Sequence, residues 1–298
     1  MGKDHLLRVP PTTRLLPLPG LPLALHDHGG DGPPVLLLHG FLDTGRSFDA
    51  VAAAAPHLRV LALDFRGHGA SPRAPLCASY HQLDHLKDLI RTLDRLEEEG
   101  LAPEILAGHS MGGIVALLLA GCWPERVRRL LLIESLGARP ATPSEQVGRL
   151  GRALRAFAGG PVPFRSFATP AAAAARVREN NPRLSAEGAR RFTEPILRRR
   201  ADGRWEFPFD PRLRGPSPFR HSEEFWLEVC RRVTAPVEVL AGEHGLLPAF
   251  PAAAGRLAAL PRARLRTVPG AGHALHLDHP DEIAAALGRL LTSPATTA

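Results

Sequence analysis

The sequence predicts an α/β protein with a mainly parallel sheet and helices on both faces. Short apolar runs alternate with helix-like segments, and this alternation is typical of parallel strands joined by helices. The expected strands lie at 35–38, 59–63, 104–107 and 129–133, with helices at about 46–55, 81–99 and 112–121. After a long gap the pattern resumes, with strands at 237–241 and 263–268 and a helix at about 280–291.

The ends and the composition agree with this fold class. The stretch from Leu15 to Asp27 alternates loosely around Pro19-Gly20, which predicts an opening hairpin. A chain of 298 residues can bury one large core, and with only 5% aromatic residues the core must be filled by aliphatic side chains. We therefore expect a single core that carries an insertion in the gap.

The pentapeptide Gly108-His109-Ser110-Met111-Gly112 lies between the strand at 104–107 and the helix-like run at 114–120. A sharp turn between a strand and a helix exposes a serine hydroxyl as a nucleophile. Side chains two positions before and after the serine would collide, and both positions are glycine. The alternative interpretation is a glycine-rich turn of an ordinary α/β protein.

Three further motifs follow expected strands. His39-Gly40-Phe41-Leu42-Asp43 comes directly after the strand at 35–38, where a loop can donate a backbone N–H to an oxyanion hole. We expect Phe41 and Met111 to be the two donors. Asp64 and Arg66 open a glycine-rich turn that they are expected to brace, and Gly270-Ala271-Gly272-His273 lies near the C-terminus.

Together these motifs resemble the α/β-hydrolase superfamily over nearly the whole length of the chain. The resemblance implies the α/β-hydrolase fold, Ser110 as nucleophile and His273 as general base. It implies neither a metal nor an organic cofactor, and the isolated histidines show no metal-ligand spacing. The expected partner is a small-molecule substrate.

The acid of the catalytic triad departs from the commonest pattern of the superfamily. In most members it is the Asp of a Gly-x-x-Asp turn after the strand that follows the insertion, but here the turn is Gly242-Glu243-His244-Gly245. Some members carry the acid one strand earlier, and here Glu134 follows the strand at 129–133. Glu134 is therefore the expected acid. Glu243, another acid or none remain alternatives, and Glu134 could instead pair with an arginine of the insertion.

A closer resemblance is to the serine hydrolase-like family. It rests on the segment 39–49, on 64–69, on an acid directly after the strand at 129–133, and on His244-Gly245 where an Asp is expected. In that family the acid follows the same strand as Glu134, usually as Asp.

The expected organisation is a core at 1–136, a helical lid at 137–225 and the rest of the core at 226–298. Ser144 should begin a helix with an apolar stripe, Pro170 a second helix to about Glu179, and Ser185 a third to about Arg199. We expect the apolar faces to be buried on the core, over Ser110. The stripe of the first helix is Val147, Leu150, Leu154 and Phe157, and the loop after the third holds Trp205, Phe207 and Phe209. That loop either packs the lid onto the core or forms a substrate wall.

Charge and composition bear on partners and location. The net charge is +7, but the arginines are dispersed and no aromatic platform lies among them, so nucleic-acid binding is not expected. Prolines interrupt the N-terminus, and no run reaches the roughly 18 apolar residues of a membrane span, so a cytoplasmic protein is expected. The three cysteines are expected to be buried free thiols.

The function expected from these residues is that of a serine hydrolase, carboxylesterase-like, acting through an acyl-enzyme on a small to medium, largely apolar ester. Hydrolysis of C–C bonds, lactones or amides uses the same constellation. A non-catalytic ligand-binding or interaction protein on the same fold is the alternative from another class.

Overall fold

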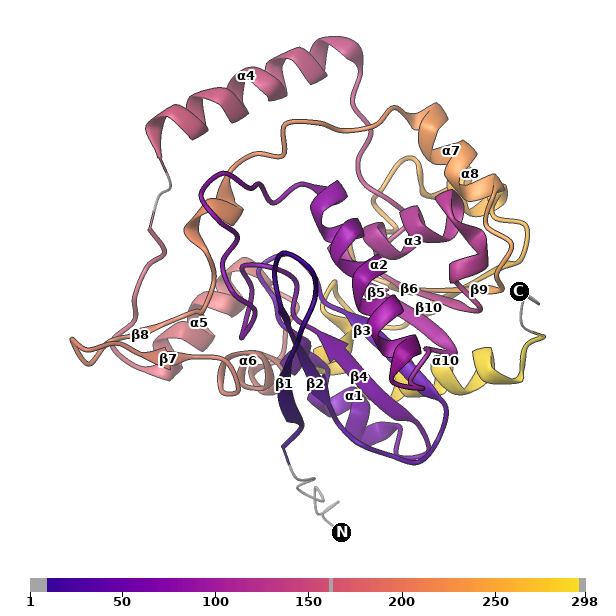
Figure 1. The fold of residues 1–298 in the computed structure, drawn as a ribbon, viewed down its shortest axis with the longest axis horizontal. Helices are drawn as coiled ribbons and strands as arrows, with labels where there is room; N and C mark the ends of the chain where they lie inside the picture. Colours follow the sequence, from indigo (N-terminus) through magenta and orange to yellow (C-terminus); the bar gives the residue numbers. More distant parts are fainter. Residues whose placement is uncertain (1–9, 161–162, 295–298) are drawn as a thin grey trace.

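The computed structural model describes residues 10–160 and 163–294, and within these residues eight strands form one twisted sheet (Figure 1). The strand order is β1-β2-β4-β3-β5-β6-β9-β10. β2 pairs antiparallel with β1 and β4, and all other neighbours are parallel, which confirms the predicted sheet. The bounds are β1 Thr12–Leu16, β2 Leu23–Asp27, β3 Pro34–Leu38, β4 Arg59–Leu63, β5 Ile105–His109, β6 Leu130–Ile133, β9 Val237–Gly242 and β10 Ala263–Val268.

Helices cover both faces of the sheet because successive strand residues point to opposite sides. In β3, Leu36 and Leu38 join one buried cluster, while Val35 and Leu37 join another. The first cluster is covered by α2 (Gln82–Glu98), α3 (Met111–Cys122), α7 (Glu223–Arg231) and α8 (Ala253–Ala259). The second is covered by α1 (Asp49–Ala54), α9 (Leu275–Asp278) and α10 (Pro280–Thr292).

Asp64 and Arg66 brace the loop after β4, as expected. The Asp64 carboxylate accepts from the Gly45 N–H at 2.6 Å and the Ala70 N–H at 2.7 Å. Arg66 binds the buried Asp88 of α2 through two hydrogen bonds of 2.6 Å. Because the carboxyl ends of parallel strands share one edge of the sheet, this loop lies beside those that follow β3, β5 and β6.

The segment between β6 and β9 contains α4 (Pro143–Gly159), α5 (Pro170–Asn180), α6 (Ala186–Thr193), β7 (Arg198–Arg199) and β8 (Trp205–Glu206). It is anchored to the core near α9, where Asp278 accepts from the Ser185 N–H at 2.9 Å and the Leu277 carbonyl accepts from Arg191 at 2.8 Å. α4 lies apart from this anchor, across the top of Figure 1. The boundaries at 136 and 225 stay a prediction, and residues 1–9 and 295–298 of the two core segments lie outside the described residues.

Two helices of the insertion differ from their predicted bounds. α4 is capped by Thr142 rather than Ser144, because Thr142 and Glu145 form a reciprocal capping box around Pro143. α6 ends at Thr193 instead of continuing to Arg199. Pro195 explains the early end, since proline lacks the backbone N–H that the next helical hydrogen bond would need.

The prediction that the apolar face of α4 is buried on the core was wrong. Val147, Leu154 and Phe157 are 74%, 61% and 85% exposed. The helix instead contacts the chain through polar side chains, because Gln146 donates to the Pro218 carbonyl at 2.6 Å and Arg149 to the Ser217 carbonyl at 3.1 Å.

The three cysteines are free, but the prediction that all are buried was wrong for two of them. Cys77 and Cys122 are exposed, while Cys230 is buried, and desolvation raises the pKa of its thiol to about 11. Across the described ranges, no helix is both long enough and apolar enough to cross a bilayer.

Candidate active site

Ser110 lies at the sharp turn between β5 and α3, with φ 49° and ψ −110°. This left-handed backbone is strained for a residue with a side chain, and it turns the serine toward the cavity that it lines. A Cβ at Gly108 would lie 2.4 Å from the backbone of Gly112, and a Cβ at Gly112 would lie 2.2 Å from the Leu38 carbonyl oxygen. The two flanking glycines are therefore required by backbone contact.

The carboxylate of Glu134 lies directly behind His273. Its Oε2 is 3.0 Å from His273 Nδ1, and the Glu134 side chain is fully buried. Oε2 also accepts from the Leu246 and Leu247 N–H groups at 2.6 and 3.2 Å, while Oε1 accepts from the Gly242 N–H at 2.8 Å. Four donors thus hold this buried carboxylate in place, and charged groups of this kind must be hydrogen-bonded when buried.

Gly245 occupies the position where an Asp is common, and Glu134 fills the space that its side chain would need. A Cβ at Gly245 would lie 2.3 Å from both carboxylate oxygens of Glu134. Glu243, the alternative acid, is exposed and accepts from the Gly270 N–H at 2.8 Å instead of facing His273. Within the described residues Glu134 makes no ion pair with an arginine.

The loop after β3 is held by buried His39. Its Nδ1 lies 2.7 Å from the Gly40 carbonyl oxygen, and its Nε2 accepts from the Phe65 N–H at 3.0 Å. Burial lowers the pKa of His39, which keeps the ring neutral as this pattern of one donor and one acceptor requires. Because C=O and N–H point in opposite directions in a trans peptide, anchoring the Gly40 carbonyl turns the Phe41 N–H away from His39.

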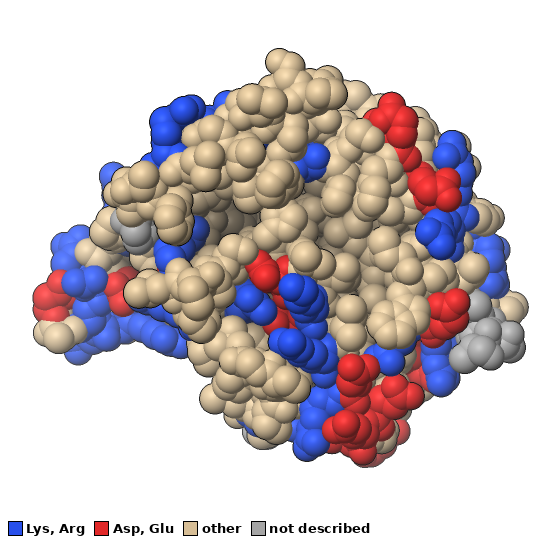
Figure 2. Space-filling model, turned by 45° about the horizontal axis from the view of Figure 1, so that its top comes forward, with Lys and Arg blue, Asp and Glu red and all other residues tan. Residues whose placement is uncertain are grey.

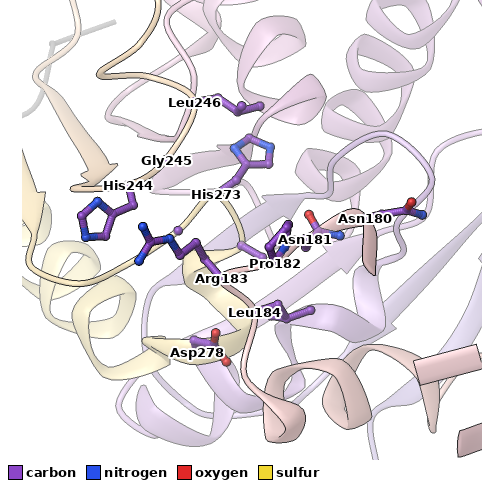
Figure 3. Close-up of a pocket in the computed structure, with 12 residues that line it drawn as sticks. Asn180, Asn181, Pro182, Arg183, Leu184, His244, Gly245, Leu246, His273 and Asp278 are labelled. Atoms are coloured by element: carbon purple, nitrogen blue, oxygen red, sulfur yellow. The ribbon is translucent and has the colours of Figure 1, made fainter. Parts of the chain in front are cut away.

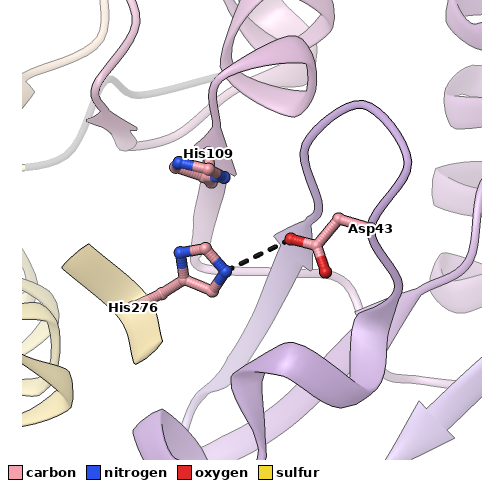
Figure 4. A group of neighbouring side chains, drawn as sticks. All are labelled: Asp43, His109 and His276. Atoms are coloured by element: carbon pink, nitrogen blue, oxygen red, sulfur yellow. Dashed lines mark hydrogen bonds and ion pairs between the residues drawn. The ribbon is translucent and has the colours of Figure 1, made fainter. Parts of the chain in front are cut away.

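A second group of buried side chains lies beneath the serine turn (Figure 4). His109 Nε2 is 2.9 Å from the His273 carbonyl oxygen, and His276 Nε2 is 3.2 Å from Asp43 Oδ2. Desolvation, with smaller contributions from His276 and His273, lowers the pKa of His109 well below its usual value. Ligand atoms of Asp43, His109 and His276 lie within 4.8 Å of one another, a donor set suited to a transition metal.

No spacing in the sequence reveals this group, because its members come from three separate segments. Asp43 already accepts from the Thr44 N–H at 2.7 Å and from Ser47 Oγ at 3.2 Å. Together with His276, these donors satisfy the carboxylate without a cation. We therefore interpret the group as support for the loop that bears Phe41.

A cavity of about 890 Å³ is lined by Ser110 and His273 together with Gly40 and Phe41. Its walls are aromatic and come largely from the insertion: Phe164, Phe167, Phe192, Phe207 and Phe209. Trp205 is not among the lining residues; it pairs with Phe167 through the backbone. Across the described residues, the Ser110 hydroxyl and the His273 ring share this cavity without a hydrogen bond between them.

A second, smaller cavity of about 230 Å³ also borders His273 (Figure 3). Its lining includes the polar side chains of Asn181, Arg183 and His244. Leu246, from the loop that binds Glu134 through its backbone, also lines it. His273 therefore lines two cavities of different size, and Asn180, Asn181 and Leu184 line both as well.

The chain matches the model of the alpha/beta hydrolase family over residues 35–286. It is 30% identical to the sn-1-specific diacylglycerol lipase ABHD11 of Mus musculus over 88% of this chain and 82% of that protein. It is 27% identical to a serine hydrolase-like protein of Danio rerio, over 74% and 68% of the two chains. The crystal structure of the hypothetical protein PA1622 from Pseudomonas aeruginosa PAO1 superposes with a TM-score of 0.82 at 34% identity, over 95% and 98%. The chain therefore belongs to the alpha/beta hydrolase family, close to its serine hydrolase-like members.

Proposed function

We propose that this hydrolase is a carboxylesterase-like serine hydrolase that acts through an acyl-enzyme on a small to medium, largely apolar ester. One observation carries the proposal: the buried Glu134 carboxylate lies 3.0 Å from His273 Nδ1, and His273 shares its cavity with the strained Ser110. A carboxylate in that position fixes the tautomer in which Nε2 is free to accept a proton.

In the proposed reaction, Ser110 Oγ attacks the substrate carbonyl carbon while its proton passes to His273 Nε2. Glu134 stabilises the imidazolium, and the N–H groups of Phe41 and Met111 bind the oxygen that becomes negative. Collapse of the tetrahedral intermediate breaks the bond to the leaving alcohol, which takes the proton from His273. Water then attacks the acyl-enzyme by the same route, which releases the acid and restores the serine.

The shape of the cavity supports an apolar acyl group. Six phenylalanines line it, and Phe207 stacks on Phe209 with ring centroids 5.7 Å apart. Most of these side chains come from the segment 137–225, so we propose that this segment is a lid that forms the substrate wall. Hydrolysis of C–C bonds, lactones or amides would use the same residues, and a binding protein without turnover remains the alternative from another class.

Labelling with a fluorophosphonate probe and hydrolysis of p-nitrophenyl butyrate test the proposal together. We expect the wild-type protein to be labelled and active, and Ser110→Ala to lose both properties. The melting temperature of the variant should stay close to that of the wild type, because the hydroxyl contributes chemistry and little packing. Labelling or turnover that persists in Ser110→Ala would contradict the assignment, and an unlabelled, inactive wild type would favour the binding protein.

A further inference from the structure

The larger cavity carries positive charge in its lining that ester hydrolysis alone does not use. Arg165, Arg176 and Arg214 all line it, and all three are exposed. Among its lining residues Asp43 is the single acid, and that carboxylate is buried and bound by His276. Figure 2 shows a hollow in the face turned forward, with Lys or Arg atoms at its left edge.

Two of these arginines have no carboxylate partner in the described part of the chain. Arg176 pairs with Glu179 at 2.8 Å, so its charge is partly offset. Arg165 and Arg214 make no such pair, and the Arg214 guanidinium lies 5.2 Å from the centre of the Phe164 ring. Many other arginines do find partners, as Arg126 does with Asp94. The cavity lining therefore keeps a net positive charge beside aromatic walls.

The charge lies on the insertion and the nucleophile on the core. Arg176 belongs to α5, and Arg214 ends the short helix Pro211–Arg214. Ser110 and His273 instead follow strands of the main sheet. A substrate that fills the cavity between them presents its carbonyl to Ser110 and a more remote group to the arginines.

We propose that the part of this cavity lined by the insertion binds an oxyanion. This oxyanion is a phosphate or carboxylate group of the substrate, located at a distance from the scissile carbonyl. Guanidinium groups match both oxyanions through paired N–H donors, and apolar surroundings strengthen the attraction. The inference rests on the proposed function and narrows it: the substrate is an apolar ester or thioester with an anionic end.

Two matched substrate pairs test this inference and distinguish where the anion lies. For the acyl side, mono-p-nitrophenyl glutarate is compared with p-nitrophenyl valerate, whose acyl chain has the same length. For the leaving-group side, butyryl-coenzyme A is compared with S-butyrylpantetheine, which keeps the pantetheine arm and lacks the phosphates and the adenosine. Each pair is measured with the wild type, with Arg165→Gln/Arg214→Gln, and with Arg152→Gln/Arg155→Gln. The last variant is a matched control, because both arginines are exposed on α4 and neither lines the cavity.

We expect the wild type to favour the anionic member of one pair by about tenfold or more in kcat/KM, as hydrogen bonds to charged groups allow. Arg165→Gln/Arg214→Gln should lower kcat/KM about tenfold more for that anionic member than for its neutral partner. The α4 control should change neither. Added salt should weaken the preference, because the arginines are exposed.

Equal kcat/KM within both pairs would overturn the inference while leaving the proposed function intact. An equal fall in kcat/KM on the charged and the neutral substrate in a folded Arg165→Gln/Arg214→Gln variant would have the same meaning. If no substrate is turned over, the proposed function fails, and calorimetry with glutarate and coenzyme A on Ser110→Ala decides the inference. Binding that Arg165→Gln/Arg214→Gln abolishes would support the oxyanion site, and no binding would refute it. If the double variant does not fold, Arg165→Gln alone is used, because Arg165 makes no ion pair or ring contact among the described residues.

Discussion

Replacing Glu134 by glutamine removes one negative charge from behind His273 and preserves the shape of the side chain. The four donors around the carboxylate decide how the amide will lie. Oε2 faces three of them, His273 Nδ1 and the N–H groups of Leu246 and Leu247, while Oε1 faces the Gly242 N–H alone. The amide oxygen should take the position with three donors, which leaves the NH₂ group against Gly242.

In this orientation the amide still accepts from His273 Nδ1, so the tautomer is retained and the loss is one of charge. A hydrogen bond to a charged group contributes roughly 1.5–3 kcal/mol, which corresponds to a fall in kcat of about ten- to hundredfold. A triad forced into the wrong tautomer would lose roughly ten-thousandfold. The unpaired N–H of Gly242 should in addition lower the stability by about 1–3 kcal/mol.

Hydrolysis of p-nitrophenyl butyrate gives kcat, and urea unfolding followed by circular dichroism gives the stability. Glu243→Gln is the matched control, because that carboxylate is exposed and accepts from the Gly270 N–H, and it should cost little. A Glu134→Gln enzyme within twofold of the wild type, together with an inactive Glu243→Gln enzyme, would refute the reasoning and reverse the assignment.

Three other perturbations follow from the same geometry. Gly245→Ala places a methyl group 2.3 Å from both oxygens of the acid and should lower kcat at least as much as the glutamine variant, whereas Gly255→Ala meets nothing within 4 Å and should retain the wild-type kcat. Phe207→Ala should change the ranking of p-nitrophenyl esters by acyl length, and Trp205→Ala should not, because Phe207 lines the cavity and Trp205 does not; the same ranking for both variants would contradict this. Burial lowers the pKa of His28 to about 4 from about 6.5 when unfolded, so the unfolded state binds more protons between these values and stability is lost as the pH falls through them. In urea unfolding, His28→Asn should reduce the loss of unfolding free energy between pH 6.5 and 4 by roughly 2–4 kcal/mol. If the unfolding free energy of the variant depends on pH as in the wild type, His28 is excluded as the source of the loss.

Strand positions and the residues at strand ends could be predicted from the sequence. The sharp turn at Ser110 depends on backbone contacts between residues that are close in sequence. Glu134 and His273 lie close together because the carboxyl ends of parallel strands share one edge of the sheet. Glu134 could also be named from the sequence as the expected substitute for the Asp missing at Gly245. What could not be predicted is how closely the Glu134 carboxylate packs against Gly245, because that distance depends on the packing of two strands.

The structure of the insertion was harder to predict, because the burial of its helices depends on contacts with residues that are distant in sequence. The apolar stripe of α4 indicates a helix by its period, but a period does not say which side meets the core, and Phe157 is 85% exposed. The buried contacts of His39 and His109 join separate segments, so no spacing reveals them. Pro195 is the exception, since its effect on α6 is local and the sequence alone contains the signal.

The loop after β9 binds Glu134 through its backbone and lines the small cavity with its side chains. Contact with Glu134 and the lining of the cavity therefore depend on different atoms of the same loop. The amides of Leu246 and Leu247 bind Glu134, while the side chains of His244 and Leu246 line the small cavity beside His273. A library that varies positions 244 and 246 and keeps Gly245 would therefore change the shape and charge of that space without replacing any group that contacts the acid. The side chains of this turn could then be exchanged to alter the small cavity, while its backbone amides continue to hold Glu134.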